Sequence, residues 1–125
     1  AFDAHVGDAI EATIDSLLGA GAPMVLWVRC PYFSATVGAD LLPPRLVASR
    51  DPARVDRLDE LIDDAAARHR GQVCVVGFDD WVDRRVDDPA IRPDGSHYEW
   101  REPTGAGDAY LASLVAAHDA CTDES

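Results

Sequence analysis

The chain has 125 residues, of which 47% are hydrophobic, and this length and composition suit one domain with a packed core. Its 23 acidic residues outnumber the 11 basic ones, all of them arginine, and the formal net charge is −12. Because nucleic acids and anionic membranes attract clustered positive charge, this composition argues against binding to either of them.

The sequence begins with a helical pattern and continues into a strand pattern. Apolar residues recur at helical spacing over residues 2–18 and predict a helix that ends at residues 19–21, Gly-Ala-Gly. The continuous apolar run at 23–28 predicts a parallel strand that is covered on both faces. Residues 29–50 hold three prolines and no clean period, so we expect a long loop that carries function.

The second half repeats the alternation. Asp51 is a good N-cap and Pro52 suits the first position of a helix that ends before Gly71. A second buried strand is predicted at 72–78, and a loop at 86–103 leads to a last helix. This helix is predicted to bury one face, formed by Tyr110, Leu111, Leu114, Val115 and His118.

The order of these elements is helix, strand, helix, strand, loop, helix, which is typical of an α/β domain with a parallel sheet. Two strands are visible in the pattern. Since three or more strands are usually needed to cover a core, we expect one partial domain over residues 1–125 that corresponds to the second half of a doubly wound fold.

The three cysteines are Cys30, Cys74 and Cys121. They are odd in number and lack C-x-x-C spacing, which argues against a zinc site and against a disulfide framework, and at least one thiol is unpaired. Cys30 and Cys74 lie in or beside apolar strand patterns, so we expect small buried side chains rather than nucleophiles.

Asp94 and His97 form the strongest chemical motif. A serine hydrolase needs an imidazole to accept the serine proton and a carboxylate on the other ring nitrogen to fix the tautomer. An Asp-x-x-His turn supplies both, although the four histidines of this chain give roughly 0.6 such matches by chance. The position favours the motif, because it follows the last buried strand, where open α/β sheets place their sites.

Several stretches together resemble a known family, and they cover nearly the whole chain. They are 1–4, 25–28 leading to 31–33, 51–58, 73–81, and 92–98 (Arg-Pro-Asp-Gly-Ser-His-Tyr) with Thr104-x-x-Gly107. In these stretches the chain is similar to the C-terminal half of the SGNH (GDSL-type) hydrolases, and most of all to the SGNH domains fused to bacterial membrane O-acyltransferases. The Asp-x-x-His block is the specific chemical motif of the resemblance.

The resemblance implies a flavodoxin-like, three-layer α/β/α fold with a parallel sheet, of which this chain is the C-terminal portion. It implies that Asp94 and His97 are the acid and base of a catalytic triad, whose serine and oxyanion-hole residues lie upstream of residue 1. The implied activity is hydrolysis or transfer of an O-linked acyl group, with an acylated cell-envelope carbohydrate or small ester as substrate and no cofactor or metal. The implied location is extracytoplasmic, with a tether to a membrane acyltransferase domain, and the isolated chain is expected to be inactive.

Other residues near the motif are candidates for substrate contact. They are Arg92, Tyr98 and Ser34, although Arg92 pairing with a loop carboxylate is the favoured role for that residue. Residues 7–9, Gly-Asp-Ala, imitate the Gly-Asp-Ser block, but they lie in a helical pattern and have alanine at the nucleophile position.

Two alternatives remain open. Residues 104–108, Thr104-Gly105-Ala106-Gly107-Asp108, also resemble the anion hole of ribokinase-type sugar kinases, where a glycine-rich helix N-terminus binds phosphate and the aspartate acts as base. A half-domain without its nucleophile could also be a non-catalytic remnant or a binding module.

Overall fold

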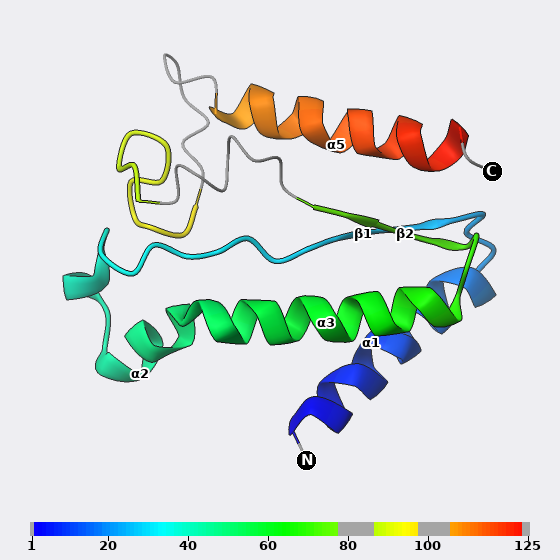
Figure 1. Cartoon of the computed structure of the whole chain (residues 1–125), viewed down its shortest axis with the longest axis horizontal. Helices are drawn as coiled ribbons and strands as arrows, with labels where there is room; N and C mark the ends of the chain where they lie inside the picture. Colours follow the sequence, from blue (N-terminus) through cyan, green and yellow to red (C-terminus); the bar gives the residue numbers. More distant parts are fainter. Residues whose placement is uncertain (1, 78–86, 98–105, 124–125) are drawn as a thin grey trace.

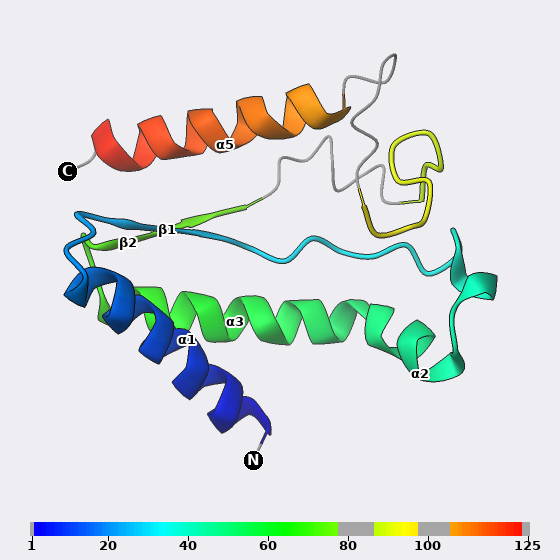
Figure 2. The same ribbon diagram turned by 180° about the vertical axis from the view of Figure 1, so that it is seen from behind.

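The computed structural model describes residues 2–77, 87–97 and 106–123. A two-stranded parallel sheet lies between helices, with α1 and α3 on one side and α5 on the other, as the two opposite views show (Figures 1 and 2). The main elements are α1 (Phe2–Gly19), β1 (Val25–Val28), α3 (Pro52–Arg68), β2 (Val73–Val76) and α5 (Ala106–Asp123). The α/β class and the two predicted parallel strands are therefore confirmed. The prediction that the first strand is covered on both faces is wrong, because Leu26 of β1 is 36% exposed.

The sheet is built from two four-residue strands rich in β-branched residues, which favour the extended conformation. They run in register from Val25 opposite Val73 to Val28 opposite Val76. The backbone N–H of Val25 donates to the carbonyl of Gln72 at 2.8 Å. Both strands are shorter than the apolar runs that predict them.

The core lies between α1, α3 and one face of the sheet. Ile10, Ile14, Ile62 and Ala65 are buried, and Trp27 of β1 packs against them. The spacing of four residues between the two isoleucines of α1 places both on one helix face, which is why the helical pattern predicts this contact. Leu17 belongs to the same predicted apolar pattern but is 45% exposed.

Helix α3 begins at the residue that the sequence predicts, Pro52. Asp51 is the N-cap, and its side chain accepts a hydrogen bond from the N–H of Ala53 at 3.1 Å. The preceding segment, predicted as a loop, contains three short turns of helix. They are η1 (Ala39–Leu41), α2 (Pro44–Val47) and η2 (Ala48–Arg50).

The predicted buried face of α5 is only partly buried. Tyr110 and Leu114 are half-buried, whereas Leu111 is 58% and Val115 61% exposed, and His118 is also exposed. The prediction of one buried face is therefore wrong for these last three residues. The reason is that a sheet of two strands is too narrow to cover the apolar surface of an 18-residue helix.

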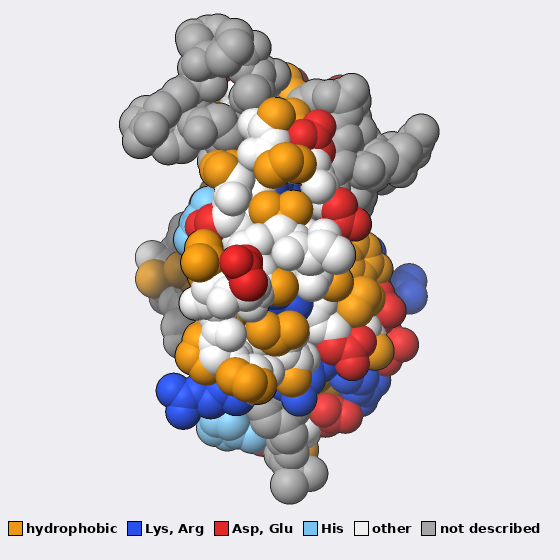
Figure 3. Space-filling view, turned by 90° about the vertical axis from the view of Figure 1, so that its left-hand side faces the viewer, with side chains coloured by type: hydrophobic (Ala, Val, Ile, Leu, Met, Phe, Trp, Pro, Cys, Tyr) orange, Lys and Arg blue, Asp and Glu red, His pale blue; other side chains and the backbone are white. Residues whose placement is uncertain are grey.

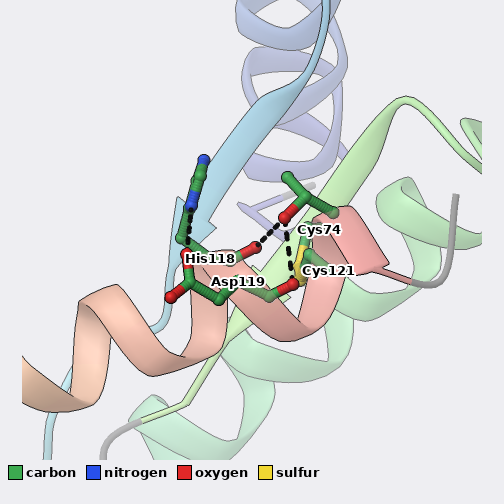
Figure 4. The surroundings of a disulfide bond; sticks show 5 residues. Cys74, His118, Asp119 and Cys121 are labelled. Atoms are coloured by element: carbon green, nitrogen blue, oxygen red, sulfur yellow. Dashed lines mark hydrogen bonds and ion pairs between the residues drawn. A yellow bond between two sulfur atoms is a disulfide. The ribbon is translucent and has the colours of Figure 1, made fainter.

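A disulfide bond joins Cys74 of β2 to Cys121 of α5, with the two Cα atoms 6.2 Å apart (Figure 4). The cysteine count and spacing argue against a disulfide framework, and Cys74 was expected to be a small buried side chain, so this single disulfide corrects the prediction for Cys74. The packing of α5 on β2 brings the two sulfurs together, and their spacing in the sequence gives no sign of this contact. Cys30 is a free, half-buried thiol. Burial raises its pKa, which disfavours the nucleophilic thiolate.

Candidate functional site

The loop that carries the Asp-x-x-His motif lies beyond the carboxyl ends of both strands. In Figure 1 the strands run towards the side of the molecule that holds residues 87–97, η1 and α2. Figure 3 looks at this side and shows hydrophobic side chains along the middle of the face, with acidic side chains among them. Leu41 of η1 and Leu46 of α2 are exposed hydrophobic residues of this region.

Asp94 and His97 contact one another directly. Oδ2 of Asp94 lies 2.6 Å from Nδ1 of His97, a distance at which the Nδ1–H group donates a hydrogen bond to the carboxylate. The side chain of His97 is 86% exposed and that of Asp94 is 50% exposed. The motif therefore forms a surface acid–base pair rather than a buried ion pair.

The backbone of the turn holds the Asp94 carboxylate in place. Its Oδ1 accepts hydrogen bonds from the N–H groups of Ser96 at 2.8 Å and His97 at 2.7 Å. The turn passes through Gly95, whose φ of +74° favours glycine. The His97 side-chain hydrogen bond, followed by these backbone bonds, holds the pKa of Asp94 well below its ordinary value of 3.8.

Asp94 contacts Nδ1 of His97 and leaves the other ring nitrogen, Nε2, outside the pair. A carboxylate on Nδ1 fixes the tautomer in which Nε2 is unprotonated and can accept a proton. No serine, threonine or cysteine hydroxyl or thiol within residues 2–77, 87–97 and 106–123 makes a hydrogen bond to Nε2. The pair therefore has the geometry of a general base, and the described residues supply no nucleophile to it.

Arg50 connects the turn to the rest of the protein. This side chain is 6% exposed, and its guanidinium donates four hydrogen bonds, two of them to the carbonyl of Asp94 at 3.0 Å and the hydroxyl of Ser96 at 3.3 Å. The other two go to the carbonyls of Ser34 and Val37. Sequence reasoning missed Arg50, because a single arginine at the end of a proline-rich segment gives no signal of contacts 44 residues away.

Arg92 is a second arginine that forms hydrogen bonds with the backbone around the turn. It is 1% exposed and donates to the backbone carbonyls of Tyr32 and Ser96, while its guanidinium lies over the ring of Phe33, 5.9 Å from the centroid. With so little exposed surface, Arg92 is closed off from solvent in this conformation, and its predicted contact with substrate stays a prediction. Arg92 thus links the motif loop to the segment that follows β1.

Ser34, another predicted candidate for substrate contact, is completely buried. Its hydroxyl donates to Oδ1 of Asp87 at 2.6 Å and accepts from the N–H groups of Thr36 and Val37. Its own N–H donates to the carbonyl of Gly95 at 2.9 Å. The hydroxyl therefore organises a turn and is not available to substrate here.

The remaining sequence candidates are placed only in part. Tyr98 and residues 104–105 lie outside the described residues, so the predicted contact of Tyr98 and the kinase-like glycine motif stay predictions. Asp108 is an exposed residue in the first turn of α5. Residues 7–9 lie inside α1, as the helical pattern predicts.

Other kinds of site are limited in the described part of the chain. It holds no cluster of three or more His, Cys, Asp or Glu side chains that could bind a metal ion. None of its helices is both long and apolar enough to span a bilayer. A pocket of about 700 Å³ lies between α1 and α3, lined by residues that include Val6, Leu58 and Leu61, and no residue of the motif loop contributes to it.

Comparison with known proteins identifies no relative of this sequence. No family model matches the sequence, and neither a curated protein nor a solved structure is significantly similar to it.

Proposed function

We propose that Asp94 and His97 are the acid and base of an SGNH-type ester hydrolase or O-acyltransferase, whose serine nucleophile comes from outside this sequence. The observation that carries the proposal is the 2.6 Å contact between Asp94 Oδ2 and His97 Nδ1, which leaves Nε2 exposed beyond the carboxyl ends of the strands. The family resemblance of residues 92–98 supports the same assignment.

The chemistry of the pair follows from its geometry. Nε2 of His97 accepts the proton of the serine hydroxyl as the serine oxygen attacks the ester carbonyl, and the ionised Asp94 stabilises the imidazolium that forms. The same proton passes to the leaving alcohol when the ester bond breaks. Water or a sugar hydroxyl then attacks the acyl-serine and gives its proton to His97. As the acyl-serine bond breaks, His97 returns this proton to the serine oxygen, which releases the acid or the new ester and restores both residues. Hydrolysis and transfer thus use the same two residues.

The proposal includes the finer fold, in which this chain is the C-terminal portion of a flavodoxin-like α/β/α domain. Exposed apolar side chains on the sheet and on α5 support it, since Leu26 of β1 is 36% exposed, Leu111 of α5 is 58% exposed and Val115 of α5 is 61% exposed. In the described sheet β1 pairs on one edge alone, with β2. Further parallel strands beside β1, with the nucleophile at a strand end, would cover this surface and complete the site.

The substrate class is proposed from the resemblance. We propose an O-acylated carbohydrate of the cell envelope, most simply an acetyl ester, and an extracytoplasmic location with a tether to a membrane acyltransferase. Product analysis with an acetylated sugar donor and a second sugar as acceptor separates the two activities. Release of acetate alone indicates an esterase, whereas an acetylated acceptor indicates a transferase.

The test of the proposed function uses the natural protein that contains this chain, with p-nitrophenyl acetate as substrate. We expect His97→Ala and Asp94→Asn each to lower kcat by about 10²- to 10⁴-fold, the usual contribution of a general base and its partner. The matched controls are His118→Ala and Asp119→Asn, since these residues also form an exposed His–Asp contact, at 3.2 Å, on α5.

Two results would overturn the proposal. The first is that the natural protein shows no esterase turnover, or that its turnover is the same in His97→Ala as in the wild type. The second is turnover by the 125-residue chain alone that disappears in His97→Ala, because the described residues bring no nucleophile to Nε2.

A further inference from the structure

We propose that Arg50 is a positioning residue, which holds the Asp94–His97 turn in the geometry of a general base without touching substrate. This inference rests on the proposed function, because it concerns the acid–base pair of that site. The role goes beyond a general contribution to folding, since Arg50 bonds the backbone of the catalytic turn itself.

The four hydrogen bonds of Arg50 join two segments that are distant in sequence. Nη1 donates to the carbonyls of Ser34 at 2.8 Å and Val37 at 2.7 Å. Nη2 donates to the carbonyl of Asp94 at 3.0 Å and the hydroxyl of Ser96 at 3.3 Å. One guanidinium therefore fixes residues 94–96 relative to residues 34–37, immediately beside the Asp94 carboxylate.

Two glycines allow the segments to approach this closely. A Cβ atom on Gly95 would lie 2.7 Å from Nη1 of Arg50 and would overlap the carbonyl of Val37. A Cβ atom on Gly38 would lie 2.7 Å from the carbonyl oxygen of Asp94. All three contacts are shorter than real Cβ atoms make, so the two backbones and the guanidinium are packed without spare space.

The role of Arg50 is geometric, and this distinguishes it from an ordinary ion pair. It forms no salt bridge with a carboxylate in the described part of the chain, and its partners are four neutral oxygens. The bonds that lower the pKa of Asp94 come from His97 and Ser96, within the turn itself. Arg50 thus acts by fixing the turn in which those bonds form. A lysine, with three donors on one nitrogen, keeps the charge but loses the planar fork.

The experiment measures the imidazole of His97 directly by ¹⁵N NMR on this chain, in the wild type and in Arg50→Met, Arg50→Lys and Ser96→Ala. In the wild type we expect the neutral ring to carry its proton on Nδ1. In Arg50→Met we expect a mixture of the two tautomers and a rise of the Asp94 pKa towards its ordinary value of 3.8. Arg50→Lys should restore the wild-type signals only in part.

The controls separate positioning from folding. Arg45→Met removes an exposed arginine from α2, in the same segment, and should change neither readout. The amide signals of β1 and β2 report whether each variant keeps the fold. Ser96→Ala removes a single bond of Arg50 and should shift the tautomer balance in the same direction as Arg50→Met, which keeps the proposal testable if Arg50→Met unfolds.

The outcomes distinguish this inference from the proposed function. If Arg50→Met folds and keeps the wild-type tautomer of His97 and the wild-type pKa of Asp94, the positioning role is refuted. If Arg50→Met does not fold, an unchanged tautomer balance in Ser96→Ala refutes it. In the natural protein we expect Arg50→Lys to lower kcat by about 10- to 100-fold with KM little changed, as for a misplaced catalytic group. Turnover that is insensitive to His97→Ala would instead refute the proposed function, whatever the NMR result.

Discussion

Substituting Gly95 by alanine tests the packing of the motif loop against its neighbours. The left-handed φ of +74° costs an alanine about 1–2 kcal/mol. The new Cβ atom would also lie 3.1 Å from Cβ of Ser34 and overlap the carbonyl of Val37, and overpacking of this kind costs about 1–3 kcal/mol. The expected destabilisation of the folded loop is therefore about 2–5 kcal/mol.

The chain contains a matched control. Gly71 has a φ of +77°, and no atom lies within 4 Å of a Cβ built on it. Gly71→Ala thus carries the backbone cost alone, about 1–2 kcal/mol. The difference between the two variants isolates the close approach of residues 34–37 to the motif loop.

Urea unfolding measures the global free energy of both variants, and hydrogen exchange measures the loop itself. The Ser34 amide is the local reporter, because it donates to the carbonyl of Gly95 at 2.9 Å. We expect its exchange to accelerate in Gly95→Ala and to stay at the wild-type rate, corrected for global stability, in Gly71→Ala. Equal urea midpoints together with equal Ser34 exchange rates in the two variants would refute the packing argument.

Three further measurements test the disulfide, the core and the pH dependence of stability. Cys121→Ser opens a covalent ring with a sequence separation of 47, so loop entropy predicts a loss of about 4 kcal/mol in unfolding free energy, and a wild type equally stable with and without reductant would contradict this. Ile14→Ala removes a side chain that is 1% exposed and should cost about 2–5 kcal/mol in urea unfolding, whereas the exposed Leu17→Ala should cost under about 1 kcal/mol. The folded pKa of Asp94 lies below its ordinary 3.8, so its stabilising contribution is complete above that pH and is lost as the pH falls below it. The difference in unfolding free energy between wild type and Asp94→Asn should therefore shrink from pH 6 to pH 3, and a constant difference would show that folding does not lower the pKa of Asp94.

Local patterns predicted the elements whose stability depends on nearby residues. The spacing of Ile10 and Ile14 predicted α1, and Asp51 with Pro52 marked the first turn of α3. The two apolar runs predicted parallel strands, because a sheet buried on both faces needs apolar residues in succession. The internal contact of Asp94 with His97 was also expected, since the turn chemistry lies within four residues.

Contacts between distant segments were beyond sequence reasoning. Nothing in the composition of residues 29–50 relates Arg50 to the carbonyl of Asp94, 44 residues later. Three cysteines allow three different pairs, and only the position of α5 on β2 selects Cys74 with Cys121. The exposure of Leu111 was missed for a related reason, since the helical pattern gives a face but not the width of the sheet beneath it.

The disulfide has a consequence for proteolysis. Residues 87–97, with the Asp94–His97 pair, lie between Cys74 and Cys121 in the sequence, so they belong to a closed covalent ring. A protease that cuts one peptide bond inside this ring adds the mass of one water molecule but releases no fragment until a reductant is added. A nicked protein would therefore retain both sides of its motif loop on one molecule, and only reduction of the disulfide would separate them.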